Sequence, residues 1–124
     1  MNVAVIGASD KPERYSYKAV KLLTDKGHKV FPIHQRVKLI DGIPVFRSIK
    51  DVPEPVDTVT LYVAADISTV LEDEVFGKKP KRIIFNPGAE NPTMAEKARA
   101  RGIATINACT LVLLNTGQFS TAGY

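Results

Sequence analysis

The fold is decided by residues 1–35, which read MNVAVIGASDKPERYSYKAVKLLTDKGHKVFPIHQ. Apolar runs at 3–6 and 29–33 predict two buried strands. Between them, apolar residues from Ala19 to Leu23 recur at helical spacing, and Gly27 supplies a helix stop. This strand, helix, strand pattern is typical of a βαβ unit, in which the two strands are parallel.

The rest of the chain continues the alternation. Further strands are predicted at 56–63, 82–85 and 103–106, with a short irregular strand around 44–46. Asp66 is the expected N-cap of one helix that ends at Gly77. Asn91, as N-cap, and Pro92, as first residue, are expected to begin another helix, which ends at Gly102. Residues 109–115 are expected to form either a short helix or an extended tail.

These elements predict an α/β, Rossmann-like fold. We expect a doubly wound, five-stranded parallel sheet with strand order 3-2-1-4-5 and helices on both faces. The 124 residues form a single domain, 1–124, in this prediction. In that strand order the binding crevice lies above strands 1 and 4, at their carboxyl ends.

The turn after the first strand, Gly7 to Asp10, lies where doubly wound proteins hold nucleotide phosphates. The dinucleotide fingerprint requires glycine at the first, third and sixth positions, and here only Gly7 meets it, since Ser9 and Pro12 fill the others. No carboxylate follows the second strand to bind ribose hydroxyls, whereas Arg36 and Lys38 are cationic. The sequence therefore favours a ligand with a phosphorylated ribose, CoA or NADP, over NAD.

Several segments, in this order, match a known family. They are VAVIGAS at 3–9, RYSY at 14–17, VFPIH at 30–34, GIPVF at 42–46, SI at 48–49 and VPEPVD at 52–57. On these residues the chain resembles the small CoA-binding domain proteins, which share their fold with the CoA-binding domains of succinyl-CoA synthetase and the NDP-forming acyl-CoA synthetases. The resemblance implies coenzyme A or an acyl-CoA as cofactor. It also implies an acyl-CoA ligase partner chain, because similar domains work beside acyl-CoA ligase domains. A homodimer is the other assembly that we expect.

The predicted ligand contacts form four groups. The turn offers backbone N–H groups and a hydroxyl to pyrophosphate, and the resemblance adds the Arg-x-Ser-Tyr segment. The second strand ends where an adenosine would lie, followed by the cationic rim, and the third and fourth strands end in small or polar residues. The cofactor-binding residues are Gly7, Ala8, Ser9, Arg14, Ser16, Pro32, His34, Arg36, Lys38, Val63, Ala64, Asn86 and Gly88. Each also has a plain structural alternative: a tight turn, a solvated loop or core packing.

Composition narrows the function further. The net charge of +4 comes from scattered basic residues without interleaved aromatics, which argues against nucleic-acid binding. No apolar run approaches bilayer length and no signal sequence opens the chain, so we expect no membrane association and a cytoplasmic protein. Two distant histidines and the single Cys109 show no metal-ligand spacing.

No catalytic motif appears either, and the sequence assigns no catalytic residue. The leading interpretation is therefore a stand-alone, non-catalytic module that binds coenzyme A or an acyl-CoA. Two alternatives stay open: a small NADP-binding oxidoreductase or sensor, and a protein-interaction domain that has lost its nucleotide.

Overall fold

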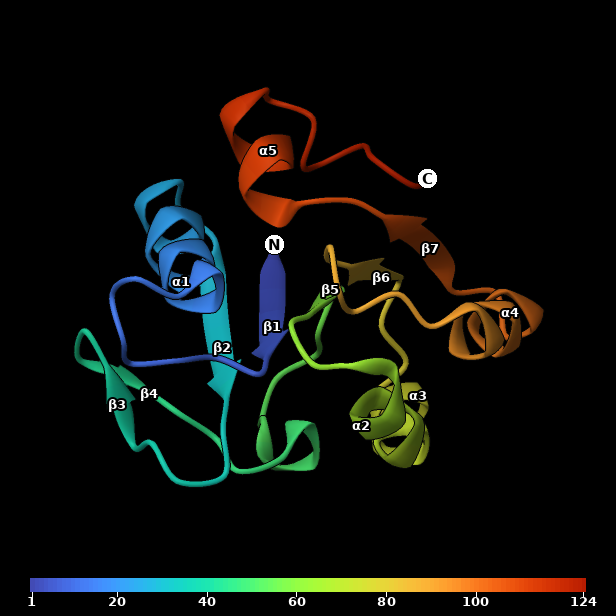
Figure 1. Ribbon diagram of the computed structural model, residues 1–124, viewed down its shortest axis with the longest axis horizontal. Coiled ribbons are helices and arrows are strands. Elements are labelled where there is room, and N and C mark those ends of the chain that lie inside the picture. Colours follow the sequence, from blue (N-terminus) through green and yellow to red (C-terminus); the bar gives the residue numbers. More distant parts are fainter.

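The structure, a computed structural model, describes residues 1–124 as a parallel sheet covered by helices on both faces (Figure 1). Its elements, in chain order, are β1 Asn2–Ile6, α1 Tyr15–Asp25, β2 Lys29–Ile33, β3 Leu39–Ile40, β4 Ile43–Pro44, the 3-10 helix η1 Ile49–Asp51, β5 Thr58–Leu61, α2 Ala65–Val70, α3 Glu72–Gly77, β6 Arg82–Phe85, α4 Pro92–Ala100, β7 Ala104–Asn107 and α5 Thr110–Asn115. None of these helices is long and apolar enough to span a membrane.

The five-stranded parallel sheet is confirmed, but the predicted strand order is wrong. The order is β2-β1-β5-β6-β7, so the third long strand, β5, pairs with β1 rather than with β2. The reason lies in β2, where Pro32 is paired with Val5 of β1. Proline has no N–H to donate to a second neighbour, which confines it to an edge strand. The order in terms of the five long strands is therefore 2-1-3-4-5.

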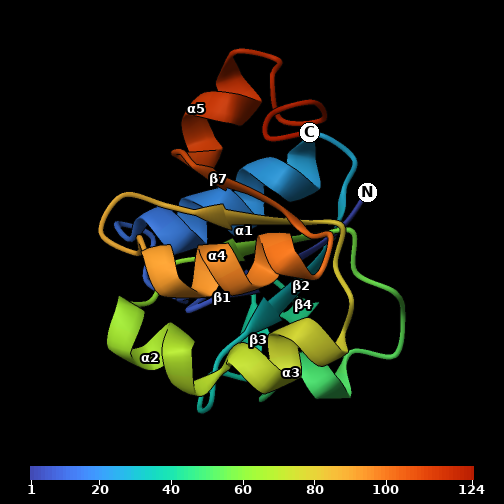
Figure 2. The same ribbon diagram turned by 90° about the vertical axis from the view of Figure 1, so that its right-hand side faces the viewer.

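Alternation along β1 builds two hydrophobic cores. Val3 and Val5 are completely buried against α1 and α5, whereas Ala4 and Ile6 face the core shared with η1, α3 and α4. Figure 2 shows this layering, with α5 on one side of the sheet and the pair α2 and α3 on the other. Because β1 lies between β2 and β5, its carboxyl end emerges inside the sheet rather than at its edge.

The segment after β5 differs from the single predicted helix. It forms two short helices, α2 and α3, which meet at Leu71. Ala64 holds the N-cap position of α2, and the predicted cap Asp66 lies in the first turn instead. The Asn91 side chain donates to Ser68 Oγ at 2.8 Å and holds the Ser68 face of α2 against the protein. As a result Ile67 and Val70 are 49% and 80% exposed.

Other local predictions are confirmed. Asn91 caps α4 by accepting a hydrogen bond from Met94 N at 3.1 Å, Pro92 is its first residue, and Gly102 follows the helix with φ of 78°. The segment 109–115 is helical from Thr110 to Asn115. The irregular strand expected around 44–46 is a short hairpin of β3 and β4, followed by a parallel bridge between Phe46 and Ile33.

Candidate functional site

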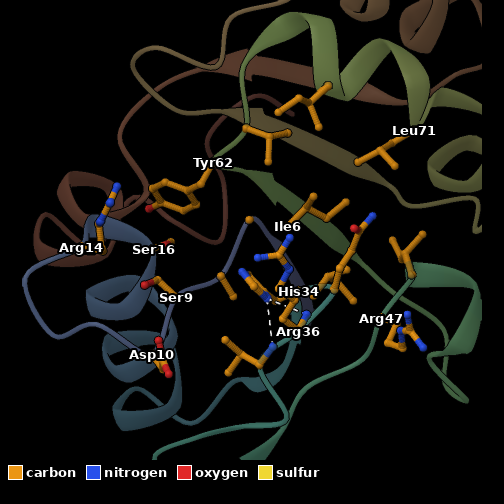
Figure 3. A pocket seen from close by; sticks show the side chains of 18 of the residues that line it. Ile6, Ser9, Asp10, Arg14, Ser16, His34, Arg36, Arg47, Tyr62 and Leu71 are labelled. Carbon is orange, nitrogen blue, oxygen red and sulfur yellow. Dashed lines mark hydrogen bonds between the residues drawn. The ribbon is translucent and has the colours of Figure 1, made fainter.

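A cleft of about 930 Å³ opens at the carboxyl ends of β1 and β5 (Figure 3). This volume is typical of ligand pockets. The connection that follows β1 leads to β2 on one side of it, whereas β5 and the connection that follows β5 lie on the other side. The two connections therefore diverge at this point, as they do at the binding crevice of doubly wound folds. The crevice predicted above strands 1 and 4 is thus displaced by one strand, to the first and third, because the predicted strand order was wrong.

Gly7 allows the two strand ends to approach each other closely. Its φ is 85°, in the left-handed region that favours glycine. A Cβ atom at this position would lie 2.8 Å from Val63 Cγ1 and 3.0 Å from the Tyr62 carbonyl oxygen. Any side chain here would therefore push β5 away and deform the floor of the cleft.

The turn after β1 offers fewer donors than the sequence suggests. The N–H groups of Gly7 and Ala8 both donate to the Ile33 carbonyl, at 3.3 and 3.2 Å. Ser9 Oγ accepts from Lys11 N at 3.1 Å, whereas the N–H groups of Ser9 and Asp10 have no partner within the protein. The donors available to an anion are therefore those of Ser9 and Asp10, and Gly7 and Ala8 shape the turn.

The amino terminus of α1 adds further donors to the same place. Arg14 occupies its N-cap position without a side-chain capping bond, and no acidic residue lies in the first turn. The N–H groups of Tyr15 and Ser16 consequently have no acceptor. Arg14, Tyr15 and the buried Ser16 all line the cleft. Unpaired N–H groups and the helix dipole favour an anionic group at this point.

The loop after β2 forms the next wall, and His34 holds its shape. His34 Nδ1 accepts hydrogen bonds from Arg36 N at 2.9 Å and Val37 N at 3.0 Å. This assigns the ring proton of the neutral imidazole to Nε2. Arg36 lies on the exposed rim of the cleft beside His34 (Figure 3).

The opposite wall was missed by the sequence analysis. Arg47 and Ile49 line it from the connection before β5, and Leu71 and Glu74 line it from the α2–α3 segment. Figure 3 shows Leu71 and Arg47 across the cleft from Ser9 and Asp10. One residue near this wall, Phe46, could have indicated it. Phe46 forms a bridge with Ile33, and this bridge brings the residues that follow Phe46 to the end of β2.

Tyr62 closes the cleft at the end of β5. Its hydroxyl is buried without a hydrogen-bond partner. Burial raises the pKa of this hydroxyl far above its usual value near 10, so the side chain is neutral at physiological pH. Tyr62 therefore presents a neutral aromatic wall rather than a group able to lose its proton.

The cleft brings together eight of the predicted contacts, Gly7, Ala8, Ser9, Arg14, Ser16, His34, Arg36 and Val63. The remaining five, Pro32, Lys38, Ala64, Asn86 and Gly88, do not line it. The Asn86 side chain is used inside the protein: its amide donates to Thr60 Oγ1 at 2.7 Å, and its oxygen accepts from Thr110 N at 2.8 Å. These bonds attach the start of α5 to the sheet, which is a structural role.

Comparison with known proteins identifies relatives of this fold and cleft. Residues 1–115 match a protein-family model described as a CoA binding domain. A crystal structure of an uncharacterized protein superimposes with a TM-score of 0.90 at 35% sequence identity, and the match covers 95% of this chain and 97% of that one.

Two curated proteins match about half of the chain. The alpha subunit of an ADP-forming acetate–CoA ligase II from Pyrococcus furiosus is 36% identical over 62 residues, which are 49% of this chain and 14% of that protein. YneT of Bacillus subtilis is 30% identical over 60 residues, 48% of this chain and 44% of that protein. The matched region is thus less than half the length of either of these relatives.

Proposed function

Because the chain belongs to the CoA-binding domain family, we propose that its cleft binds coenzyme A or an acyl-CoA, and that the domain acts as a binding module without chemistry of its own. The observation that best supports this proposal is a group of unpaired N–H donors at Ser9, Asp10 and the start of α1. These donors lie at one end of a cleft that is large enough for a ligand. These donors suit the pyrophosphate. Ser16 and Arg14 stand beside them.

The adenosine end is assigned to the loop after β2. In doubly wound folds the ribose of a nucleotide lies near the end of this strand. Arg36 on the rim provides a guanidinium for the ribose phosphate of CoA, to which arginine is well suited. Lys38 has no part in this proposal, because it lies outside the cleft.

We also propose a setting for the module, which one of its relatives supports. The Pyrococcus relative is named as a ligase subunit, which supports the proposal that this domain works beside an acyl-CoA ligase chain. We place it in the cytoplasm, where the free Cys109 would stay reduced. In this proposal residues 1–124 act as one domain.

Thermal unfolding with CoA, NADP and NAD tests the proposal. A ligand that binds only the folded state adds about 2.7 kcal/mol of stability at 100 times its dissociation constant. We expect CoA to raise the unfolding midpoint and NAD to leave it unchanged. A rise with NADP but not with CoA would favour the oxidoreductase or sensor, and no rise with any of them would favour a domain without a nucleotide.

A further inference from the structure

The wall of the cleft opposite the phosphate donors is a largely apolar slot that contains one carboxylate, Glu74, and has the exposed Arg47 on its rim. Ile49 is 1% exposed, and Leu71 packs against the same hydrophobic core. Ile33, which is 7% exposed and whose carbonyl accepts from the Gly7 and Ala8 N–H groups, connects this slot to the turn after β1. All three line the cleft together with Glu74. A slot of this kind suits a flat, largely apolar ring with one polar edge group.

Glu74 is held in place by Ser48. Ser48 Oγ donates to Glu74 Oε2 at 2.7 Å and accepts from Lys50 N at 3.1 Å, so its proton is directed to the carboxylate. Lys50 Nζ lies 4.0 Å from the same oxygen, Oε2. Both contacts of the carboxylate involve Oε2, which leaves Oε1 as an unused acceptor on a side chain that is only 21% exposed.

The direction of the ligand brings its base to this slot. With pyrophosphate at the Ser9 turn and ribose beside Arg36, the base continues past the end of β2. The residues met there are those of the apolar slot, which Phe46 brings to Ile33 through their bridge. The phosphate donors and the slot lie across the cleft from each other, as the positions of Ser9 and Leu71 in Figure 3 illustrate.

We propose that Glu74 selects adenine in this cleft by accepting a hydrogen bond from its exocyclic amine. A carboxylate only accepts hydrogen bonds, and adenine presents an amine donor where hypoxanthine and guanine present a carbonyl acceptor. In the position that brings the 6-substituent to Glu74 Oε1, a base with that carbonyl places two acceptors face to face, and its ring N1–H reaches the carboxylate only if the base shifts within the slot. The inference rests on the proposed function, because it assumes that a CoA-type nucleotide occupies the cleft.

The test compares CoA with its hypoxanthine counterpart, in which a carbonyl replaces the amine. We expect the parent protein to bind CoA roughly tenfold to a hundredfold more tightly, the usual range for a hydrogen bond to a charged group. Glu74→Gln should largely abolish this preference, because a side-chain amide donates to the carbonyl as readily as it accepts from the amine. Ser48→Ala should reduce the preference partially, because it removes the bond that orients Glu74.

Asp73→Asn is the matched control, since Asp73 is exposed on the same helix and carries the same charge outside the cleft. It should keep the preference of the parent. An unchanged preference in both Glu74→Gln and Ser48→Ala, with CoA still bound, would overturn this inference and leave the proposed function standing. Failure of the parent to bind either ligand would overturn both.

Discussion

Replacement of Arg36 by alanine should weaken the binding of CoA much more than that of dephospho-CoA. The two ligands differ only in the phosphate on the ribose, and Arg36 is the cation that lines the cleft where β2 ends. A hydrogen bond between charged groups contributes about 1.5 to 3 kcal/mol. Arg36 is exposed, so screening by salt places the expected effect at the lower end, roughly a tenfold loss for CoA.

Lys38→Ala provides the control that the structure makes available. Lys38 lies two residues away and carries the same charge, but it does not line the cleft. Its replacement should leave the affinity for both ligands within about twofold of the parent, since its charge acts only at long range through salt.

Isothermal titration of both ligands into the parent and the two variants, at one fixed salt concentration, measures the coupling directly. Equal losses for CoA and dephospho-CoA in Arg36→Ala would show that this residue does not meet the ribose phosphate. A selective loss in Lys38→Ala instead would show that the loop after β2 holds the ligand in another orientation.

Three further changes test the site and its support. Gly7→Ala should abolish CoA binding and reduce the free energy of unfolding by about 1 to 3 kcal/mol, because the new Cβ would lie 3.0 Å from the Tyr62 carbonyl oxygen on a backbone in the left-handed conformation. Denaturant titration measures this loss, and unchanged stability would refute the close approach of the two strand ends. Ser9→Trp should abolish CoA binding while circular dichroism stays native, because the indole would fill the space in front of the turn; unchanged affinity would place the ligand elsewhere. Burial and the nearby amino terminus lower the pKa of His28, so the unfolded chain binds more protons below pH 6.5 and stability should fall as the pH drops through this value. His28→Gln should flatten this dependence.

The first unit and α4 follow from the sequence because their signals are local. Gly27 ends α1, and Asn91 with Pro92 begins α4. Each of these residues acts only on the backbone within a few positions of it, and both features are present in the structure. The same holds for the Gly7 turn, whose position after an apolar run marks the end of β1. Local chemistry therefore predicts the turn at one end of the cleft, but it does not predict which N–H groups of that turn are unpaired, because this depends on the Ile33 carbonyl of the neighbouring strand β2.

Strand order and the face of α2 depend on contacts between distant residues. Pro32 did carry a readable signal, since a proline within a strand points to a sheet edge. For α2 there was no comparable signal: Ile67 and Val70 recur at helical spacing, but the bond from Asn91 to Ser68, 23 residues apart, fixes which face of the helix is covered. Periodicity describes which residues share a helix face, but not which face the rest of the chain covers.

The position of β5 beside β1, where β6 was predicted, determines which residues line the cleft. If β5 paired with β2, the exit of β1 would face the end of β6, and Asn86 and Gly88 would stand at the crevice. With β5 beside β1, those two residues lie outside the cleft, and α3 and the segment before η1 supply its far wall instead. Ser48 and Glu74 meet there across 26 residues of sequence that contain no motif for either. In the proposed binding mode, the phosphates meet a turn that the sequence predicts, whereas the base meets side chains that tertiary packing brings together. A substitution at Glu74 should therefore change which base is preferred and leave the binding of the phosphates unchanged.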